Sequence, residues 1–121
     1  MNKGSTFLGA SLAMTLTGCV HFFAQFSLVN APPHPLSAKA PEAVQVFTLP
    51  PSRPSLEIGT VSISSSGVVG GFNNPDHDAR VAMLRQEAAK QGCDAIVLRP
   101  AADAPHRVWS AACLVYTDAP R

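Results

Sequence analysis

The chain has 121 residues, enough for one domain of ordinary size. Apolar residues make up 46% of it and charged residues only 14%, and 9 Lys and Arg against 8 Asp and Glu give a formal net charge of +1. This balance excludes the basic stripe of a nucleic-acid-binding protein and the charge run of an acidic disordered tail. We therefore expect no nucleic-acid partner.

The N-terminus has the pattern of an export signal. One positive residue, Lys3, precedes the uncharged apolar stretch 7–16, which has the length expected of the apolar region of a signal peptide. The stretch ends in a tetrapeptide that resembles the lipobox of bacterial lipoproteins: Leu16, Thr17, Gly18 and Cys19. In that motif the peptidase cuts before the cysteine, whose thiol takes a diacylglycerol and whose freed amine takes a third acyl chain. Several chains make such anchoring stable, so we expect lipid on Cys19 and a membrane attachment through it.

Two alternatives remain open for this region. Residues 7–29 contain no charged side chain, so they are long enough for an uncleaved transmembrane anchor. Residues 29–31 resemble the small-x-small end of an ordinary signal peptide, although Pro32 directly after them normally blocks cleavage. In the lipoprotein interpretation, Val20 rather than Asp follows Cys19, which resembles the pattern of outer-membrane sorting. We therefore expect a lipid-anchored protein of the bacterial outer membrane that faces the periplasm.

Two segments separate Cys19 from the expected domain. Phe22, Phe23 and Phe26 suit either the membrane interface or a short strand or helix packed elsewhere. Segment 31–41 contains four prolines and no periodicity, which indicates a spacer without packed structure. Such a spacer is stiff and extended, and at about 3.1 Å per residue it holds a domain roughly 30 Å from its anchor. We expect the domain to begin near Glu42.

The remainder alternates strand and helix signals. Period-two alternation and short apolar runs predict four strands, at 43–48, 56–64, 94–99 and 108–116. The parity of the apolar residues shifts within the second strand, which predicts a β-bulge at Gly59. A loop is expected at 100–105, between the last two strands.

One amphipathic helix lies between the second and third strands. Asn74, proline at the first helical position and Asp76 predict its start, and Gly92 predicts its C-cap. Val81, Leu84 and Ala88 form the predicted apolar face, Arg80 lies on the polar face, and Arg85 lies along the edge of the apolar stripe.

The order β-β-α-β-β predicts an α+β fold, a small mixed β-sheet with one helix packed on one face. We expect residues 1–18 to be a lipoprotein signal peptide, 19–41 a lipidated N-terminus and proline-rich spacer, 42–117 a small α/β periplasmic domain, and 118–121 a tail. So small a core is marginally stable alone, and a covalent link would help it.

Cys93 and Cys113 are the cysteines that remain once Cys19 carries lipid, and export places them in an oxidising compartment. A hairpin centred near Asp103 places them opposite each other, each 10 residues from the centre. Opposed positions are within disulfide range, so we predict a bond between them. The alternatives are two buried free thiols, or a register that differs by one and turns Cys93 to the other face.

Three segments, 57–61, the helix 79–92 and the strand 94–98, resemble the periplasmic domain of the Rcs stress-sensor lipoprotein family. The lipobox, the proline-rich segment and the late strand with Cys113 match that layout as well. The resemblance implies a small α/β fold and a non-enzymatic lipoprotein. The sensor family carries four domain cysteines in two disulfides, whereas this chain has two, of which only Cys113 lies at a family position; the sensing role therefore does not carry over. The pattern helix–Gly–x–Asp–Ala is also similar to small cytoplasmic domains associated with heavy-metal binding.

The sequence context of the candidate reactive groups favours structural roles for them. Ser64, Ser65 and Ser66 lack the strand-to-helix context of a nucleophile elbow, and the glycine-rich segment 67–71 lacks the Gly-Lys-Ser/Thr ending of a phosphate loop. Weak metal-ligand candidates are Asp76, His77 and Asp78, but acids are favoured at a helix start by capping and by the macrodipole. We expect the protein to have no enzymatic activity and to bind no cofactor. The expected function is a membrane-anchored envelope lipoprotein whose domain binds or monitors envelope components, with an envelope protein as partner; the alternative is a metal- or small-ligand-binding periplasmic module.

Overall fold

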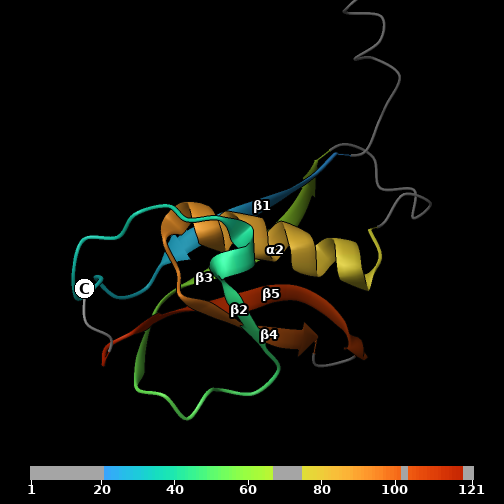
Figure 1. Ribbon diagram of the computed structural model, residues 1–121. Coiled ribbons are helices and arrows are strands. Elements are labelled where there is room, and N and C mark those ends of the chain that lie inside the picture. Colours follow the sequence, from blue (N-terminus) through green and yellow to red (C-terminus); the bar gives the residue numbers. More distant parts are fainter. Residues whose placement is uncertain (1–20, 67–74, 102–103, 119–121) are drawn as a thin grey trace, which may run out of the picture. The chain divides into compact units, whose positions relative to one another are not determined.

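A computed structural model describes residues 21–66, 75–101 and 104–118. Nearly all of these belong to one compact unit, 23–64 with 75–121; residues 21–22 and 65–66 belong to a second unit, 1–22 with 65–74. The elements, shown in Figure 1, are β1 (His21–Leu28), η1 (Pro41–Ala43), β2 (Gln45–Phe47), β3 (Ser55–Ser66), α2 (His77–Gln91), β4 (Ala95–Ala101) and β5 (Ala104–Tyr116).

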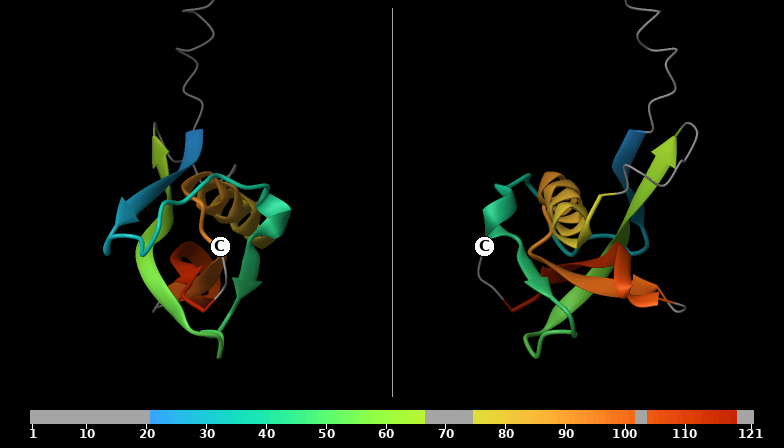
Figure 2. Two further views of the ribbon diagram at one scale, coloured as in Figure 1. Left: turned by 60° about the vertical axis from the view of Figure 1, so that its left-hand side comes forward. Right: turned by 90° about the vertical axis from the view of Figure 1, so that its right-hand side faces the viewer.

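The strands form a single mixed sheet in the order β1-β3-β5-β4-β2. β5 is antiparallel to both of its neighbours, and β2 is parallel to β4. Consequently β3 and β4, which α2 connects, run in the same direction on either side of β5. Helix α2 packs on one face of this sheet (Figure 2). The predicted α+β fold class is therefore confirmed, with one strand, β1, more than expected.

The predicted bulge lies in β3. Glu57 is opposite Leu114 and Gly59 is opposite Cys113, so Ile58 is the extra residue. A Cβ on Gly59 would lie 2.5 Å from Cζ of Phe26, which leaves no room for a side chain between β3 and β1. Glycine at this position thus lets β1 approach.

β1 and the segment after it are part of the folded unit, so the domain boundary near Glu42 is wrong. The backbone N–H groups of Val29 and Asn30 both donate to the Ile58 carbonyl, at 2.7 and 3.1 Å. Farther along, the Lys39 N–H donates to the Ala89 carbonyl at 3.0 Å. The proline-rich segment therefore folds back against the helix end rather than extending as a spacer.

Helix α2 is capped at both ends. The Asp76 carboxylate accepts a hydrogen bond from the Ala79 N–H at 2.8 Å, which makes Asp76 the N-cap, so proline precedes the cap rather than taking the first helical position. Gly92 adopts the left-handed conformation at φ 83°, as predicted for a C-cap. Leu84 and Ala88 on the apolar face have no exposed area.

Arg80 is buried, contrary to the prediction that it lies on the polar face of the helix. Its Nε donates to the Val108 carbonyl at 2.8 Å and its Nη1 to the Pro75 carbonyl at 2.6 Å. The guanidinium also lies 5.0 Å from the ring centre of Trp109. Burial of this charge is compensated by two carbonyls and an aromatic face, which the helical periodicity does not reveal.

Both faces of the central sheet are buried. On the helix side the largest fully buried side chains include Ile58, Leu84, Ile96, Val44, Val61 and Val115. On the other face Ala95, Ala112, Leu114 and Tyr116 form a second cluster, against which Phe47 and Val97 pack. The sheet is thus the middle of the unit, and Tyr116 closes one end of the second cluster.

Cys93 and Cys113 form the predicted disulfide, with a Cα–Cα distance of 5.7 Å. The geometric reason given for it is wrong, because the register places Ile96, not Cys93, opposite Cys113. Bulges on both sides of Pro100 shift the register, and β4 and β5 extend into the expected loop as far as Ala101 and Ala104. The bond therefore joins the α2–β4 connection to β5 rather than two opposed strand positions.

Candidate functional site

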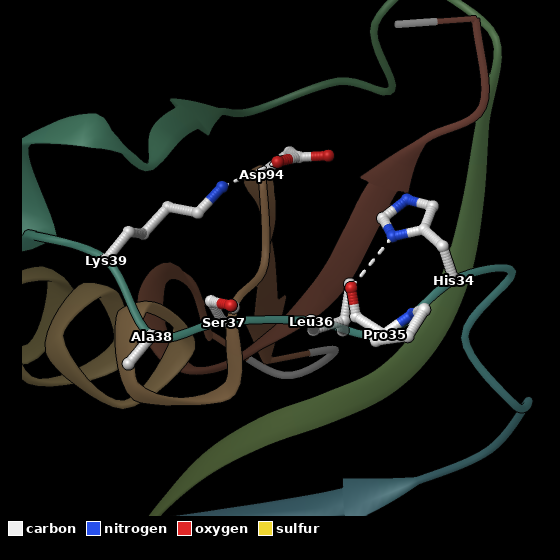
Figure 3. A pocket seen from close by; sticks show the side chains of 8 residues that line it. His34, Pro35, Leu36, Ser37, Ala38, Lys39 and Asp94 are labelled. Atoms are coloured by element: carbon white, nitrogen blue, oxygen red, sulfur yellow. Dashed lines mark hydrogen bonds and ion pairs between the residues drawn. The ribbon is translucent and has the colours of Figure 1, made fainter. Parts of the chain in front are cut away.

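The end of α2 borders a cavity of about 460 Å³ (Figure 3). Segment 34–39 forms one side of it, and the connection from α2 to β4 forms the other. The lining residues are His34, Pro35, Leu36, Ser37, Ala38, Lys39, Gly92 and Asp94. It lies between parts of the chain that are more than 50 residues apart, so its shape depends on how segment 34–39 is held.

Asp94 is the main fastening point of this region. Its Oδ1 accepts from Nζ of Lys39 at 2.6 Å, and its Oδ2 accepts from the backbone N–H of Tyr116 at 2.8 Å. Its own backbone joins two strands, because its N–H donates to the Leu114 carbonyl and its carbonyl accepts from the Gln45 N–H. Asp94 thus ties segment 34–39 to the end of β5 through its carboxylate, and β2 to both through its backbone carbonyl. A lone acid between a helix cap and an apolar strand is the sequence signal for such a role.

Gly92 lines the side of the cavity that faces segment 34–39. Its N–H donates to the Ala89 carbonyl at 3.1 Å and closes the helix. A Cβ on Gly92 would lie 2.8 Å from Cβ of Leu36 and 2.9 Å from the Ser37 carbonyl oxygen. Glycine is needed here twice, for the positive φ and for the close approach of segment 34–39.

His34 lies apart from the ion pair in Figure 3. Its Nδ1 is 3.1 Å from the Pro35 carbonyl, and because a carbonyl oxygen can only accept, Nδ1 is the donor of this hydrogen bond. Nε2 is buried and has no hydrogen-bond partner among the residues that the structure describes. The charges of Lys39 and Asp94 neutralise each other, so the cavity offers a ligand the His34 imidazole beside apolar side chains and the Ser37 hydroxyl.

Another hollow, of about 280 Å³, lies on the sheet face that α2 does not cover. Its lining residues are Pro50, Ser55, Glu57, Val97, Arg99, Ala112 and Leu114. Arg99 Nη2 and Glu57 Oε2 form an ion pair of 2.7 Å there, and the Arg53 guanidinium lies 3.8 Å from the ring centre of Tyr116. Arg99 and Glu57 thus border a floor of apolar side chains, while Arg53 is paired with Asp118 at 2.8 Å.

The weak metal-ligand candidates occupy the start of α2. Asp76 is the N-cap, and His77 and Asp78 lie in the first turn. Within 21–66, 75–101 and 104–118, no three His, Cys, Asp or Glu side chains lie close enough together to hold a metal ion. The geometry around Asp76 is that of a helix cap, which was the competing interpretation.

The lipobox residues Leu16, Thr17, Gly18 and Cys19 lie outside the described residues, as do the glycine-rich segment 67–71 and Asn74.

Arg85, expected along the edge of the apolar stripe, donates from Nε to the Val44 carbonyl at 2.8 Å. None of the helices in the described part of the chain is both long enough and apolar enough to cross a bilayer.

No protein-family model, curated protein or solved structure matches this chain.

Proposed function

We propose that the chain is a bacterial envelope lipoprotein, cut before Cys19, lipidated there and held at the outer membrane on its periplasmic side. Its domain binds or monitors envelope components, with another envelope protein as partner, and catalyses no reaction. This corresponds to the lipid-anchored, non-enzymatic status that the Rcs resemblance implies.

One observation carries the proposal: the use of the three cysteines of the chain. Two of them, Cys93 and Cys113, are bonded to each other, which is typical of proteins that fold in an oxidising compartment. The third, Cys19, ends a tetrapeptide of lipobox type after an uncharged apolar stretch. Export therefore accounts for the disulfide and for the motif together.

The charged groups of the domain support a binding rather than a catalytic role. Asp94 is engaged by Lys39 and by the Tyr116 N–H, and Arg80 is buried against two carbonyls. These groups hold the fold together, and the ion pair of Arg99 with Glu57 borders the open hollow on the sheet. A surface of mixed polar and apolar character is compatible with a protein interface.

Incorporation of labelled palmitate in a bacterium with a lipoprotein pathway tests the proposal. The wild type should take up label and Cys19→Ala should not, whereas the control variant Cys93→Ser/Cys113→Ser should still be labelled. Equal labelling of wild type and Cys19→Ala, or of neither, would contradict it. Crosslinking of the labelled protein in intact envelopes should then yield a partner band that Cys19→Ala lacks.

A second candidate function, small-ligand binding, is favoured by the cavity in Figure 3, whose 460 Å³ lies within the usual range of about 300–1,000 Å³ for ligand sites. Nε2 of His34, which has no hydrogen-bond partner within the described part of the chain, is a polar group that a ligand could engage. A fragment screen by heteronuclear NMR tests this. Shifts confined to residues 34–39 and 92–94 that disappear in His34→Phe would support it, and shifts elsewhere or none would oppose it.

A further inference from the structure

We propose that the outer edge of the sheet, the segment 23–33 that comprises most of β1 and the chain after it, lies flat on the membrane surface. This inference rests on the lipidation of Cys19 proposed above. We call residues 23–33 the anchor-side segment.

The tether between lipid and domain is short. Phe23 is the first residue of the compact unit, four positions after Cys19. Four residues span at most about 14 Å even when fully extended. Because segment 31–41 packs against the helix end instead of serving as a spacer, it adds nothing to this reach. Phe23, the first residue of the anchor-side segment, can therefore lie no farther than about 14 Å from the lipidated residue.

The chemistry of the anchor-side segment suits a bilayer interface. No Asp, Glu, Lys or Arg occurs between Lys3 and Lys39, so no charged side chain must be removed from water when the segment approaches lipid. Leu28 and Val29 are 62% and 60% exposed, at the far end of β1 from the anchor. Lys39, the first charged residue after this uncharged stretch, forms an ion pair with Asp94. Exposed apolar side chains beside a lipid anchor add burial in the headgroup region to the hold of the acyl chains.

The position of β1 at the edge of the sheet also supports a membrane contact. β1 is an edge strand of eight residues that contains none of the lysines or prolines with which exposed edges are usually protected. The other edge, β2, has only three residues. Contact with the hydrated headgroup region shields the long edge from other chains while its backbone groups remain in a polar environment.

Leu28 and Leu49 offer a matched pair of probe sites. Leu49 is 75% exposed and follows β2, the opposite edge of the sheet. Figures 1 and 2 show β1 and the loop between β2 and β3 at opposite ends of the unit. Four strand spacings of about 4.8 Å separate the two edges. A membrane contact through the anchor-side segment therefore reaches Leu28 and not Leu49.

The experiment uses full-length protein produced with its own lipid, purified in detergent and reconstituted into vesicles. Leu28→Trp and Leu49→Trp are each made in a Trp109→Phe background, and intact mass verifies lipid on Cys19 in the same samples. With a phospholipid brominated near the top of its acyl chains, Trp emission should fall in Leu28→Trp and stay unchanged in Leu49→Trp.

Three results would overturn the inference. Unquenched emission from Leu28→Trp in lipidated protein shows that the domain stands away from the bilayer, and leaves the proposed function intact. Crosslinks between two copies through β1, without quenching, show that a second chain covers the edge instead. Absence of lipid on Cys19 removes the proposed function and, with it, this inference.

Discussion

Lys39 and Asp94 form an ion pair of 2.6 Å although 55 residues separate them in the chain. The pair fastens a proline-rich segment to the start of β4, at the point where the carboxylate also accepts the Tyr116 N–H. A segment with the composition of a linker is thereby part of the fold.

Asp94→Ala should lower the free energy of unfolding by about 1–3 kcal/mol, because it leaves the part-buried Tyr116 N–H without its acceptor. Lys39→Met removes only the ion pair and should cost less than about 1 kcal/mol. Urea unfolding measures both. Lys90→Met is the control, since Lys90 is 75% exposed and 3.9 Å from Glu87. An effect of Asp94→Ala no larger than that of Lys90→Met would show that Asp94 fastens nothing.

The Cys93–Cys113 disulfide should contribute about 3 kcal/mol to stability in the chain-entropy model, given the sequence separation of 20 between the two cysteines. The variant Cys93→Ser/Cys113→Ser and the wild type under reducing conditions should therefore unfold at similar, lower urea concentrations. Alkylation without reduction, followed by mass spectrometry, should leave both cysteines unmodified in the wild type. Two alkylated cysteines would contradict the bond.

Tyr116 should make the unfolding free energy fall at alkaline pH. Burial raises the pKa of its phenol above the ordinary value of 10.0, and the hydroxyl donates to Oε1 of Gln45. Because the folded state holds this proton more tightly than the unfolded state, the stabilisation is complete below about pH 10 and declines as the pH rises through the folded pKa.

The measurement is urea unfolding from pH 8 to pH 11 (about the range over which a tyrosine titrates) in the wild type and in Tyr116→Phe. The variant should be less stable at neutral pH and show a flatter decline above it. Parallel declines in the two proteins would assign the alkaline effect to other groups.

A fragment that begins at Glu42 should be less stable than one that begins at Val20. The truncation removes β1, whose neighbours on β3 include Gly59, and it removes Lys39 from Asp94. Thermal unfolding followed by circular dichroism compares the two fragments. Equal midpoints would restore the prediction that residues 31–41 are an unpacked spacer.

Local signals predicted the central elements well. Gly92 has the left-handed φ expected of a C-cap, and α2 ends at the residue before it. The bulge predicted at Gly59 lies between Glu57 and Gly59. These features depend on residues close together in the sequence, where backbone conformation and periodicity leave a direct trace.

Long-range pairing left no such trace. The apolar run with Phe23 and Phe26 suits a membrane as well as an edge strand. In the sequence, the signal for the edge strand is Gly59, a distant residue that lies against Phe26 in the folded chain. Arg80 is buried because carbonyls distant in sequence accept its hydrogen bonds. The disulfide was predicted from the compartment, while bulges beside Pro100 changed the strand register that had been used to support it.

Intact mass spectrometry of the protein purified from envelopes, alkylated before any reduction, tests the central claim most directly. The predicted species begins at Cys19, carries a diacylglycerol and one further acyl chain, and has no alkylated cysteine. A chain that retains residues 1–18, or one that begins after Ala31 and carries no lipid, would contradict it.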